Sequence, residues 1–229
     1  MFFYLILGFL FGGLVPFIAG RLGKLVPLDP GLLFLKIPHK PRFPNPKDPK
    51  RRNLLNKKWH ELWLFSFGWG MCMACLFFLC LHFLPNGLAF WGLAFCWILC
   101  VLIVIDAQYW LLPDFFTIPL LLLGMCFAFC QPQVGIQMGL IGACGGYFLS
   151  VVSVVITRLF CKNPQFGGGD VKMLTALGSW LGMLGLSYTL ILSFLLFIVF
   201  NIVPIQKKGA YGPALATAAL LVFFIMYAK

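Results

Sequence analysis

The stretch GLAFWGLAFCWILCVLIVI, residues 87–105, contains no charged side chain and is followed directly by Asp106. A helix needs about 20 consecutive apolar residues to cross a bilayer, and this stretch is long enough. Of the 229 residues in the chain, 62% are hydrophobic and 10% are charged, against about 25% charged residues in an average soluble domain. The composition excludes a soluble globular domain and predicts an all-α, polytopic membrane protein.

Similar apolar stretches on either side of this one predict about eight transmembrane helices. The predicted spans are 3–20, 61–84, 87–105, 114–131, 135–158, 172–186, 188–205 and 210–228. The break at 186–188 rests only on Gly185, Ser187 and spacing. We expect residues 1–60 to form an N-terminal transmembrane helix and a short basic loop. Residues 61–229 are expected to form the membrane domain that carries the two aspartate motifs, at Asp106 and at Asp170.

The positive charges predict the orientation in the membrane. The chain has 17 Lys and Arg against 6 Asp and Glu, and most of the basic residues lie between Arg21 and Lys58. The positive-inside rule places the basic loops in the cytoplasm. The loops so placed are 21–60, 106–113, 159–171 and 206–209. A basic loop beside a membrane meets anionic headgroups, so we expect the lipid bilayer as a partner and no nucleic acid. The sequence leaves the oligomeric state unknown.

Glycines and cysteines indicate helix packing more than chemistry. The pairs Gly135/Gly139, Gly142/Gly146 and Gly178/Gly182 have the spacing that lets helix backbones approach closely in lipid. Of nine cysteines, only Cys72 and Cys75 form a C-x-x-C pair. A structural zinc site usually needs two such pairs. We therefore expect no metal, although a zinc or redox role for this pair remains the minor alternative.

Four of the six acidic residues lie at or beside predicted span ends. Glu61 starts its span, where a helix N-terminus favours a carboxylate. The other three are Asp106, Asp114 and Asp170. Ionisable residues at such depths are functional hypotheses by default. Asp114 follows Pro113 and is expected mainly as a helix N-cap, and Asp170 has the same structural alternative. Asp106 ends a predicted helix, where its negative charge opposes the helix dipole. Asp106 and Asp170 fall on the same predicted side of the membrane, which suggests a paired-carboxylate site.

Two adjacent carboxyl groups do not both ionise easily, so they share one proton. The ionised group can take a proton from water while the protonated group donates to a scissile carbonyl oxygen. Gly167, Gly168 and Gly169 precede Asp170, and their lack of side chains would let a substrate backbone come close. An alternative without catalysis is a proton-coupled transporter, but its acids are expected near the membrane midplane.

These motifs resemble a known family. The segment from Asp106 to Asp114, which includes Leu112 and Pro113, is similar to the D-x5-[IL]-P-[DN] pattern of the type IV prepilin peptidases. The segment GGGDVK at 167–172 resembles their G-x-G-D-x-K pattern, and GPAL at 212–215 resembles a G-P-x-L that opens their last span. These enzymes are membrane aspartic proteases of the GxGD class.

The resemblance implies that Asp106 and Asp170 are catalytic, and that Gly167, Gly168, Gly169, Lys172, Pro113 and Asp114 shape the site. It implies an endopeptidase that removes the basic leader of prepilins or prepilin-like proteins of type II secretion or DNA uptake. The enzyme would be a multi-pass protein of the bacterial cytoplasmic membrane with its active site facing the cytoplasm. It would need no metal or cofactor for proteolysis.

The N-terminal region departs from the family pattern. Many members carry two C-x-x-C pairs in the first cytoplasmic loop, whereas residues 21–60 contain no cysteine. Pro16 stands where the family's N-terminal motif has Asn. Many members also methylate the new N-terminus with S-adenosylmethionine, and for this chain that cofactor and activity are doubtful. The alternative function is an inactive paralogue that binds pilin-like proteins or assists their assembly.

Overall fold

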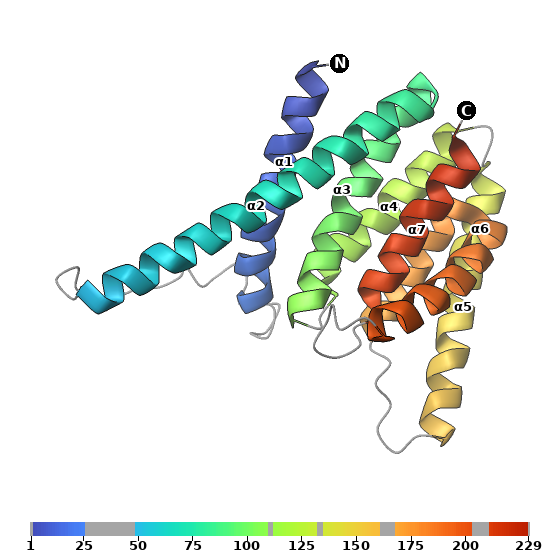
Figure 1. Cartoon of the computed structure of the whole chain (residues 1–229). Helices are drawn as coiled ribbons and strands as arrows, with labels where there is room; N and C mark the ends of the chain where they lie inside the picture. Colours follow the sequence, from blue (N-terminus) through green and yellow to red (C-terminus); the bar gives the residue numbers. More distant parts are fainter. Residues whose placement is uncertain are drawn as a thin grey trace. The chain divides into compact units, whose positions relative to one another are not determined.

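The structure, a computed structural model, describes residues 2–25, 49–109, 112–131, 135–160, 168–202 and 211–228. These residues form seven helices and no strand (Figure 1), which agrees with the all-α prediction. The helices are α1 (Phe2–Leu25), α2 (Pro49–Phe83), α3 (Asn86–Tyr109), α4 (Asp114–Cys130), α5 (Ile136–Phe160), α6 (Gly168–Ile202) and α7 (Gly212–Tyr227).

The expected count of about eight helices is not confirmed. The spans predicted at 172–186 and 188–205 fall largely within α6, and the predicted break at 186–188 is wrong. The non-helical residue in α6 is Gly182, with φ 66° and ψ −176°. A residue with a Cβ atom is strained at these backbone angles, so the bend needs a glycine. Helix α2 also begins at Pro49, earlier than the predicted 61.

Among the residues that the structure describes, four helices are long and apolar enough to cross a membrane. Their apolar segments are Leu64–Phe83, Gly87–Tyr109, Ile136–Ile156 and Gly169–Phe200. Three shorter apolar helices cover Tyr4–Gly20, Asp114–Cys130 and Gly212–Tyr227. Helices suit the hydrocarbon region because they satisfy their backbone hydrogen bonds internally. This arrangement supports a multi-pass membrane protein.

The chain divides into two compact units, Met1–Phe78 and Leu79–Lys229. In the first unit, glycines let α1 lie directly against α2. A Cβ on Gly12 would lie 2.6 Å from Cβ of Met73, and one on Gly8 would lie 3.0 Å from Cα of Ala74. The division predicted at residue 60 concerned topology and remains a prediction.

In the second unit, α6 packs against α4, α5 and α7, while α3 packs against α7. The glycine pairs explain how closely α5 and α6 approach. A Cβ on Gly142 would lie 2.7 Å from Cα of Gly182, and one on Gly146 would lie 2.9 Å from the carbonyl carbon of Leu174. The predicted packing role therefore holds for these glycines. Gly135 differs, because it has φ 69° and no atom near its Cβ position, so it serves the turn before α5.

The first arm of α6, before Gly182, runs along α7 in the same direction. Near its beginning, Asp170 lies within electrostatic range of Tyr211, which directly precedes α7. Near its end, the carbonyl oxygen of Trp180 accepts a hydrogen bond of 3.0 Å from Oη of Tyr227. Both ends of this arm are therefore matched to the corresponding ends of α7.

The second arm, after Gly182, runs back along α7 in the opposite direction. A Cβ on Gly185 would lie 2.7 Å from Sδ of Met226, near the end of α7. Ser193 Oγ lies 2.6 Å from Oη of Tyr211, beside the start of α7. The bend at Gly182 therefore returns the chain to the end of the unit where α6 began, and this brings Ser193 to the same end as Asp170.

Aromatic rings fill the core between α3, α4, α6 and α7. Trp180 is fully buried, with ring centroids 4.7 Å from Phe95 and 5.0 Å from Phe127. Its indole N–H donates a 2.8 Å hydrogen bond to the carbonyl oxygen of Leu120. Burial of these large rings, with the indole donor satisfied, fixes the first arm of α6 against its neighbours.

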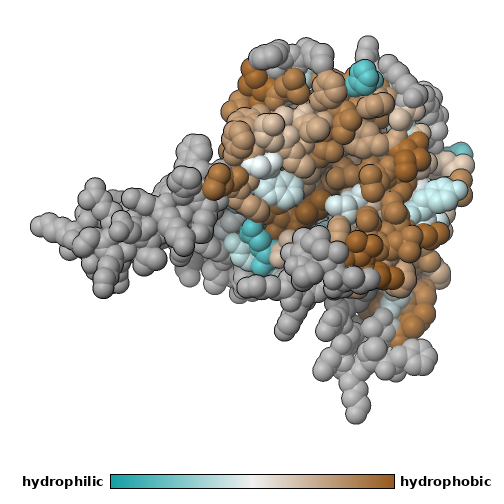
Figure 2. All heavy atoms as spheres, in the orientation of Figure 1, coloured by the Kyte–Doolittle hydropathy of each residue, from teal (hydrophilic) through white to brown (hydrophobic). Residues whose placement is uncertain are grey.

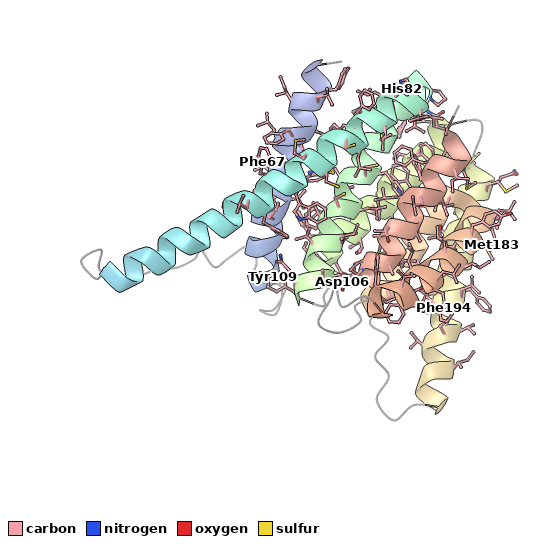
Figure 3. The ribbon with its side chains drawn as sticks, viewed as in Figure 1. Phe67, His82, Asp106, Tyr109, Met183 and Phe194 are labelled. Carbon is pink, nitrogen blue, oxygen red and sulfur yellow. The ribbon has the colours of Figure 1, made fainter. Side chains whose placement is uncertain are left out.

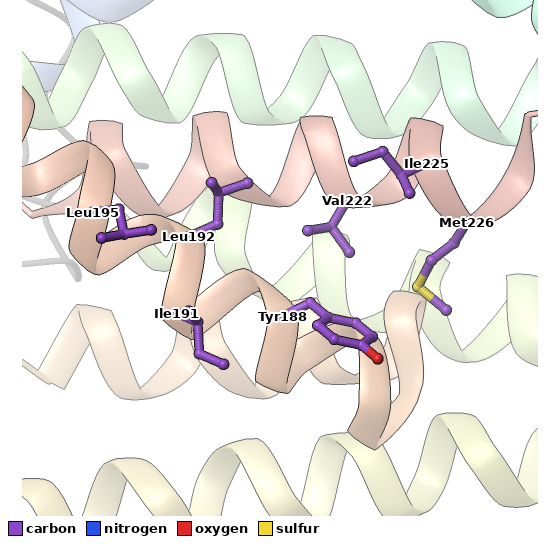
Figure 4. Close-up of a pocket in the computed structure, with 7 residues that line it drawn as sticks. All are labelled: Tyr188, Ile191, Leu192, Leu195, Val222, Ile225 and Met226. Carbon is purple, nitrogen blue, oxygen red and sulfur yellow. The ribbon is translucent and has the colours of Figure 1, made fainter.

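The outer faces of the helices are apolar. Figure 2 shows a largely hydrophobic surface over the described residues of the face drawn. Ile225 and Phe129 are 77% and 75% exposed, which is typical of side chains that meet lipid. An apolar pocket lies between the second arm of α6 and α7 (Figure 4). Its lining residues are Tyr188, Ile191, Leu192, Leu195, Val222, Ile225 and Met226, none of them a carboxylate.

Candidate active site

Asp106 lies in the last turn of α3 and is 6% exposed. Figure 3 labels Asp106 at this end of α3. Oδ2 of Asp106 accepts a 3.1 Å hydrogen bond from the backbone N–H of Gly212, the first residue of α7. The first amides of a helix have no partners within the helix and carry partial positive charge. The start of α7 therefore offsets the unfavourable position of this carboxylate at the end of α3.

Gly212 has no room for a side chain. A Cβ at this position would lie 2.8 Å from the carboxyl carbon of Asp106. The next residue is Pro213, which lacks an N–H and favours the first turn of a helix. Sequence reasoning noted the Gly-Pro pair only as part of a resemblance, and it missed Gly212 as the donor to Asp106.

Asp170 lies in the first turn of α6 and is half-buried. Its charge acts on Asp106, so the two predicted carboxylates lie within electrostatic range although they come from different helices. Two such negative charges repel each other, and a shared proton relieves that repulsion. The structure thus brings both carboxylates to one end of the second unit.

Lys172 and Asp114 form an ion pair between α6 and α4. Nζ of Lys172 lies 2.6 Å from each carboxylate oxygen of Asp114, and the two side chains are 48% and 56% exposed. The expectation of Asp114 as an N-cap is wrong. Pro113 occupies the cap position without a side-chain hydrogen bond, and Asp114 begins the helix. The Asp114 side chain instead bonds to the Lys172 ammonium, on a helix far away in the sequence.

Gly169 and Leu112 join the two motifs by direct packing. A Cβ on Gly169 would lie 2.7 Å from Cβ of Leu112 and 3.3 Å from its carbonyl oxygen. Leu112 thus fills the space that we expected a substrate backbone to use at this glycine. Gly168 begins α6, and Gly167 lies outside the described residues.

Pro113 is buried and anchors the first turn of α4. Its carbonyl oxygen accepts hydrogen bonds from the amides of Phe116 and Thr117, at 3.1 and 3.3 Å. Pro113 thus has a local structural role between Leu112 and Asp114, and it fixes where the α4 side of the site begins.

Tyr211 and Ser193 lie at the same end of the second unit as the carboxylates, and sequence reasoning missed both. The Tyr211 hydroxyl lies 2.6 Å from that of Ser193 and within electrostatic range of Asp170. Neither residue belongs to a motif that we recognised. The signal for Tyr211 would have been its position directly before the Gly-Pro pair.

Within the described part of the chain, no three His, Cys, Asp or Glu side chains come together as a metal site would require. Cys72 and Cys75 belong to the first unit, while the two carboxylates belong to the second. The chemistry that the described groups support is general acid–base catalysis by two carboxylates, with one carboxylate oriented by a helix N-terminus.

Comparison with known proteins identifies a matching family for the middle of the chain. Residues 93–202 match the type IV leader peptidase family, and this range includes Asp106 and Asp170. It ends before Tyr211 and Gly212. No solved structure matches the chain.

Similar curated proteins bear the name prepilin leader peptidase/N-methyltransferase. The protein from Neisseria gonorrhoeae is 33% identical over 150 residues, covering 60% of this chain and 52% of that protein. The one from Klebsiella pneumoniae is 42% identical over 103 residues, covering 44% and 45% respectively. The one from Dickeya chrysanthemi is 34% identical over 143 residues, covering 59% of this chain and 50% of that protein. The chain spans about half the length of these curated relatives.

Proposed function

Because residues 93–202 belong to the type IV leader peptidase family, we propose that this chain is a membrane aspartic endopeptidase that removes the leader peptide of type IV prepilins or prepilin-like proteins. The observation that carries the proposal is the convergence of Asp106 and Asp170 from α3 and α6. The names of the similar proteins, prepilin leader peptidases, agree with this substrate class.

The proposed reaction needs one proton shared by the pair. The ionised carboxylate removes a proton from a water molecule, and the water oxygen attacks the scissile carbonyl carbon. The protonated carboxyl donates its proton to the carbonyl oxygen, which gives a neutral tetrahedral intermediate. Collapse breaks the C–N bond, and the amine leaves with a proton returned by the pair. Gly212 would orient Asp106 throughout, since its amide is fixed by the start of α7.

The proposed location of the site is the cytoplasmic face of the bacterial inner membrane. The segments that lead into α6 and α7 carry Lys162, Lys207 and Lys208. Basic residues mark the loops that stay in the cytoplasm. Both α6 and α7 begin at the end of the unit that holds the carboxylates. A basic leader peptide on a substrate anchored in the same membrane would reach that end.

The function proposed for this chain is cleavage of the leader peptide, without methylation of the new N-terminus. The names of the relatives include N-methyltransferase. Residues 21–60 of this chain contain no cysteine, however, and Pro16 stands where the N-terminal pattern that the chain partly resembles has Asn. We assign no role to S-adenosylmethionine. No metal or other cofactor enters the proposed reaction.

The test is cleavage of a purified prepilin by the full chain in detergent or liposomes, with the product N-terminus read by mass spectrometry. We expect wild type to release the leader, and Asp106→Asn and Asp170→Asn to lose about 10²–10⁴-fold in rate. Asp48→Asn, which removes a carboxylate outside both motifs, is the matched control and should cleave normally. A folded wild type that binds prepilin without cleaving it would instead identify the inactive paralogue. A mass increase of one methyl group would extend the function to methylation.

A further inference from the structure

The buried hydroxyl of Ser193 has two partners on the second arm of α6 and at the start of α7. Its Oγ lies 2.9 Å from the carbonyl oxygen of Leu190 and 2.6 Å from Oη of Tyr211. A serine hydroxyl has one proton to donate. Because a carbonyl only accepts, Ser193 donates to Leu190, and the Tyr211 hydroxyl donates to Ser193. Both hydroxyl protons are thereby used.

This hydrogen bond fixes the residue next to the one that holds Asp106. Tyr211 directly precedes Gly212, and its carbonyl oxygen accepts the Leu215 amide at 3.0 Å, which closes the first turn of α7. The amide of Gly212 then lies 3.1 Å from Oδ2 of Asp106. A displacement of the Tyr211 side chain from α6 would therefore move the amide that orients this carboxylate.

The Ser193–Tyr211 hydrogen bond also lies at the end of the unit that holds Asp170, the second carboxylate. Tyr211 is within electrostatic range of Asp170, which lies in the first turn of α6. Ser193 is on the second arm, which the bend at Gly182 returns to this end of the unit. One hydroxyl pair thus joins α7 to α6 at the level where both carboxylates lie.

We propose that Ser193 and Tyr211 are positioning residues that hold the Gly212 amide against Asp106 and so set the geometry of the two carboxylates; the catalytic part of this inference rests on the proposed function. Neither residue touches the reacting atoms in this account. Their contribution is preorganisation, because a misplaced catalytic group lowers the rate steeply.

Tyr227 provides a matched control at the opposite end of α7. Its hydroxyl also joins α7 to α6, through a 3.0 Å bond to the carbonyl oxygen of Trp180. A change of Tyr to Phe at 211 or 227 removes one helix–helix hydrogen bond in each case. Only the bond at Tyr211 lies at the end of α7 that holds the carboxylates. If both bonds served stability alone, the two variants would behave alike.

The first experiment needs no substrate. Melting temperatures of the full chain in detergent are measured for Tyr211→Phe, Asp106→Ala and their combination. Removing one such hydrogen bond is expected to lower the melting temperature by about 2–4 °C. If Tyr211 acts through Gly212 on Asp106, this shift should fall to about half or less in the Asp106→Ala background. The Tyr227→Phe shift should be equal in both backgrounds. Equal shifts for Tyr211→Phe in both backgrounds would overturn the proposal.

The second experiment measures cleavage of a purified prepilin. Tyr211→Phe and Ser193→Ala should each lower kcat roughly tenfold with KM unchanged. The double variant should be no slower than either single variant, and Ser193→Thr should restore the rate because it keeps the hydroxyl. A folded Tyr211→Phe with wild-type kcat would refute the positioning role. If wild type cleaves no prepilin, that result counts against the proposed function alone, and the melting experiment still decides whether the pair positions Asp106.

Discussion

Nζ of Lys172 lies 2.6 Å from both carboxylate oxygens of Asp114, and this ion pair connects the segment that follows Asp170 to the segment that follows Asp106. Both side chains are about half exposed, so water screens much of their attraction. Pairs of this kind contribute roughly 0–1 kcal/mol to stability. The pair therefore aligns two motifs more than it stabilises the fold.

This leads to the first prediction. Lys172→Met and Asp114→Asn should each slow prepilin cleavage several-fold while lowering the melting temperature only slightly. The double variant should be no slower than the single variants, because each change already breaks the same contact. Cleavage rates of the four proteins at equal folded fraction would check this. Losses that multiply in the double variant would show that the two residues act separately.

The second prediction concerns Gly212. In Gly212→Ala the new Cβ would lie 2.8 Å from the carboxyl carbon of Asp106, so either the carboxylate or α7 must shift. We expect a stability loss of about 1–3 kcal/mol from overcrowding and a fall in kcat greater than tenfold. Gly87→Ala is the control, because nothing lies within 4 Å of its Cβ position. Wild-type kcat in Gly212→Ala would contradict the proposed role of this amide.

A third prediction tests the reversal of α6. Gly182→Ala forces a Cβ into a backbone with positive φ, and this strain costs about 1–2 kcal/mol. The melting temperature should fall, and the hydrogen bond between Ser193 and Tyr211 should be lost because the second arm of α6 changes direction. Gly68→Ala, in open space on α2, should not lower the melting temperature, because alanine favours a helix interior more than glycine does. Equal stability of the two variants would mean that the bend does not depend on glycine.

Much of the site was predictable, because its catalytic candidates stand out chemically. Few acids occur in this chain, so Asp106 and Asp170 were conspicuous at their span ends. The bend at Gly182 was not predictable, since Gly178 and Gly185 lie nearby and composition does not tell which glycine adopts a positive φ. The choice depends on how closely α5 approaches α6, which is a tertiary contact.

The partners of the polar groups were also beyond the sequence. Asp114 looked like an N-cap because helix starts favour Asp, yet its partner Lys172 comes from α6. The Gly212 amide could not be assigned to Asp106 without knowing that α7 begins beside the end of α3. The sequence does not predict the early start of α2, because the basic residues that follow Pro49 are typical of a solvated loop.

A fourth prediction follows from the shared proton. The reaction needs one protonated and one ionised carboxyl group, so kcat should fall at low pH, where both are protonated, and at high pH, where both are ionised. The two inflections belong to the pair and not to either residue. A pH profile of kcat with saturating prepilin would measure them. A rate independent of pH across the range in which the protein stays folded would contradict proton sharing.

Asp106 and Asp170 are proposed to act as one catalytic unit, and the cleavage rates of Asp106→Asn, Asp170→Asn and the double variant test this directly. Residues that act as a unit give losses that do not multiply. If the two carboxylates act together, each single variant loses about as much activity as the double variant. A single variant that retains substantial cleavage, or a double variant whose loss is the product of the single losses, would contradict it.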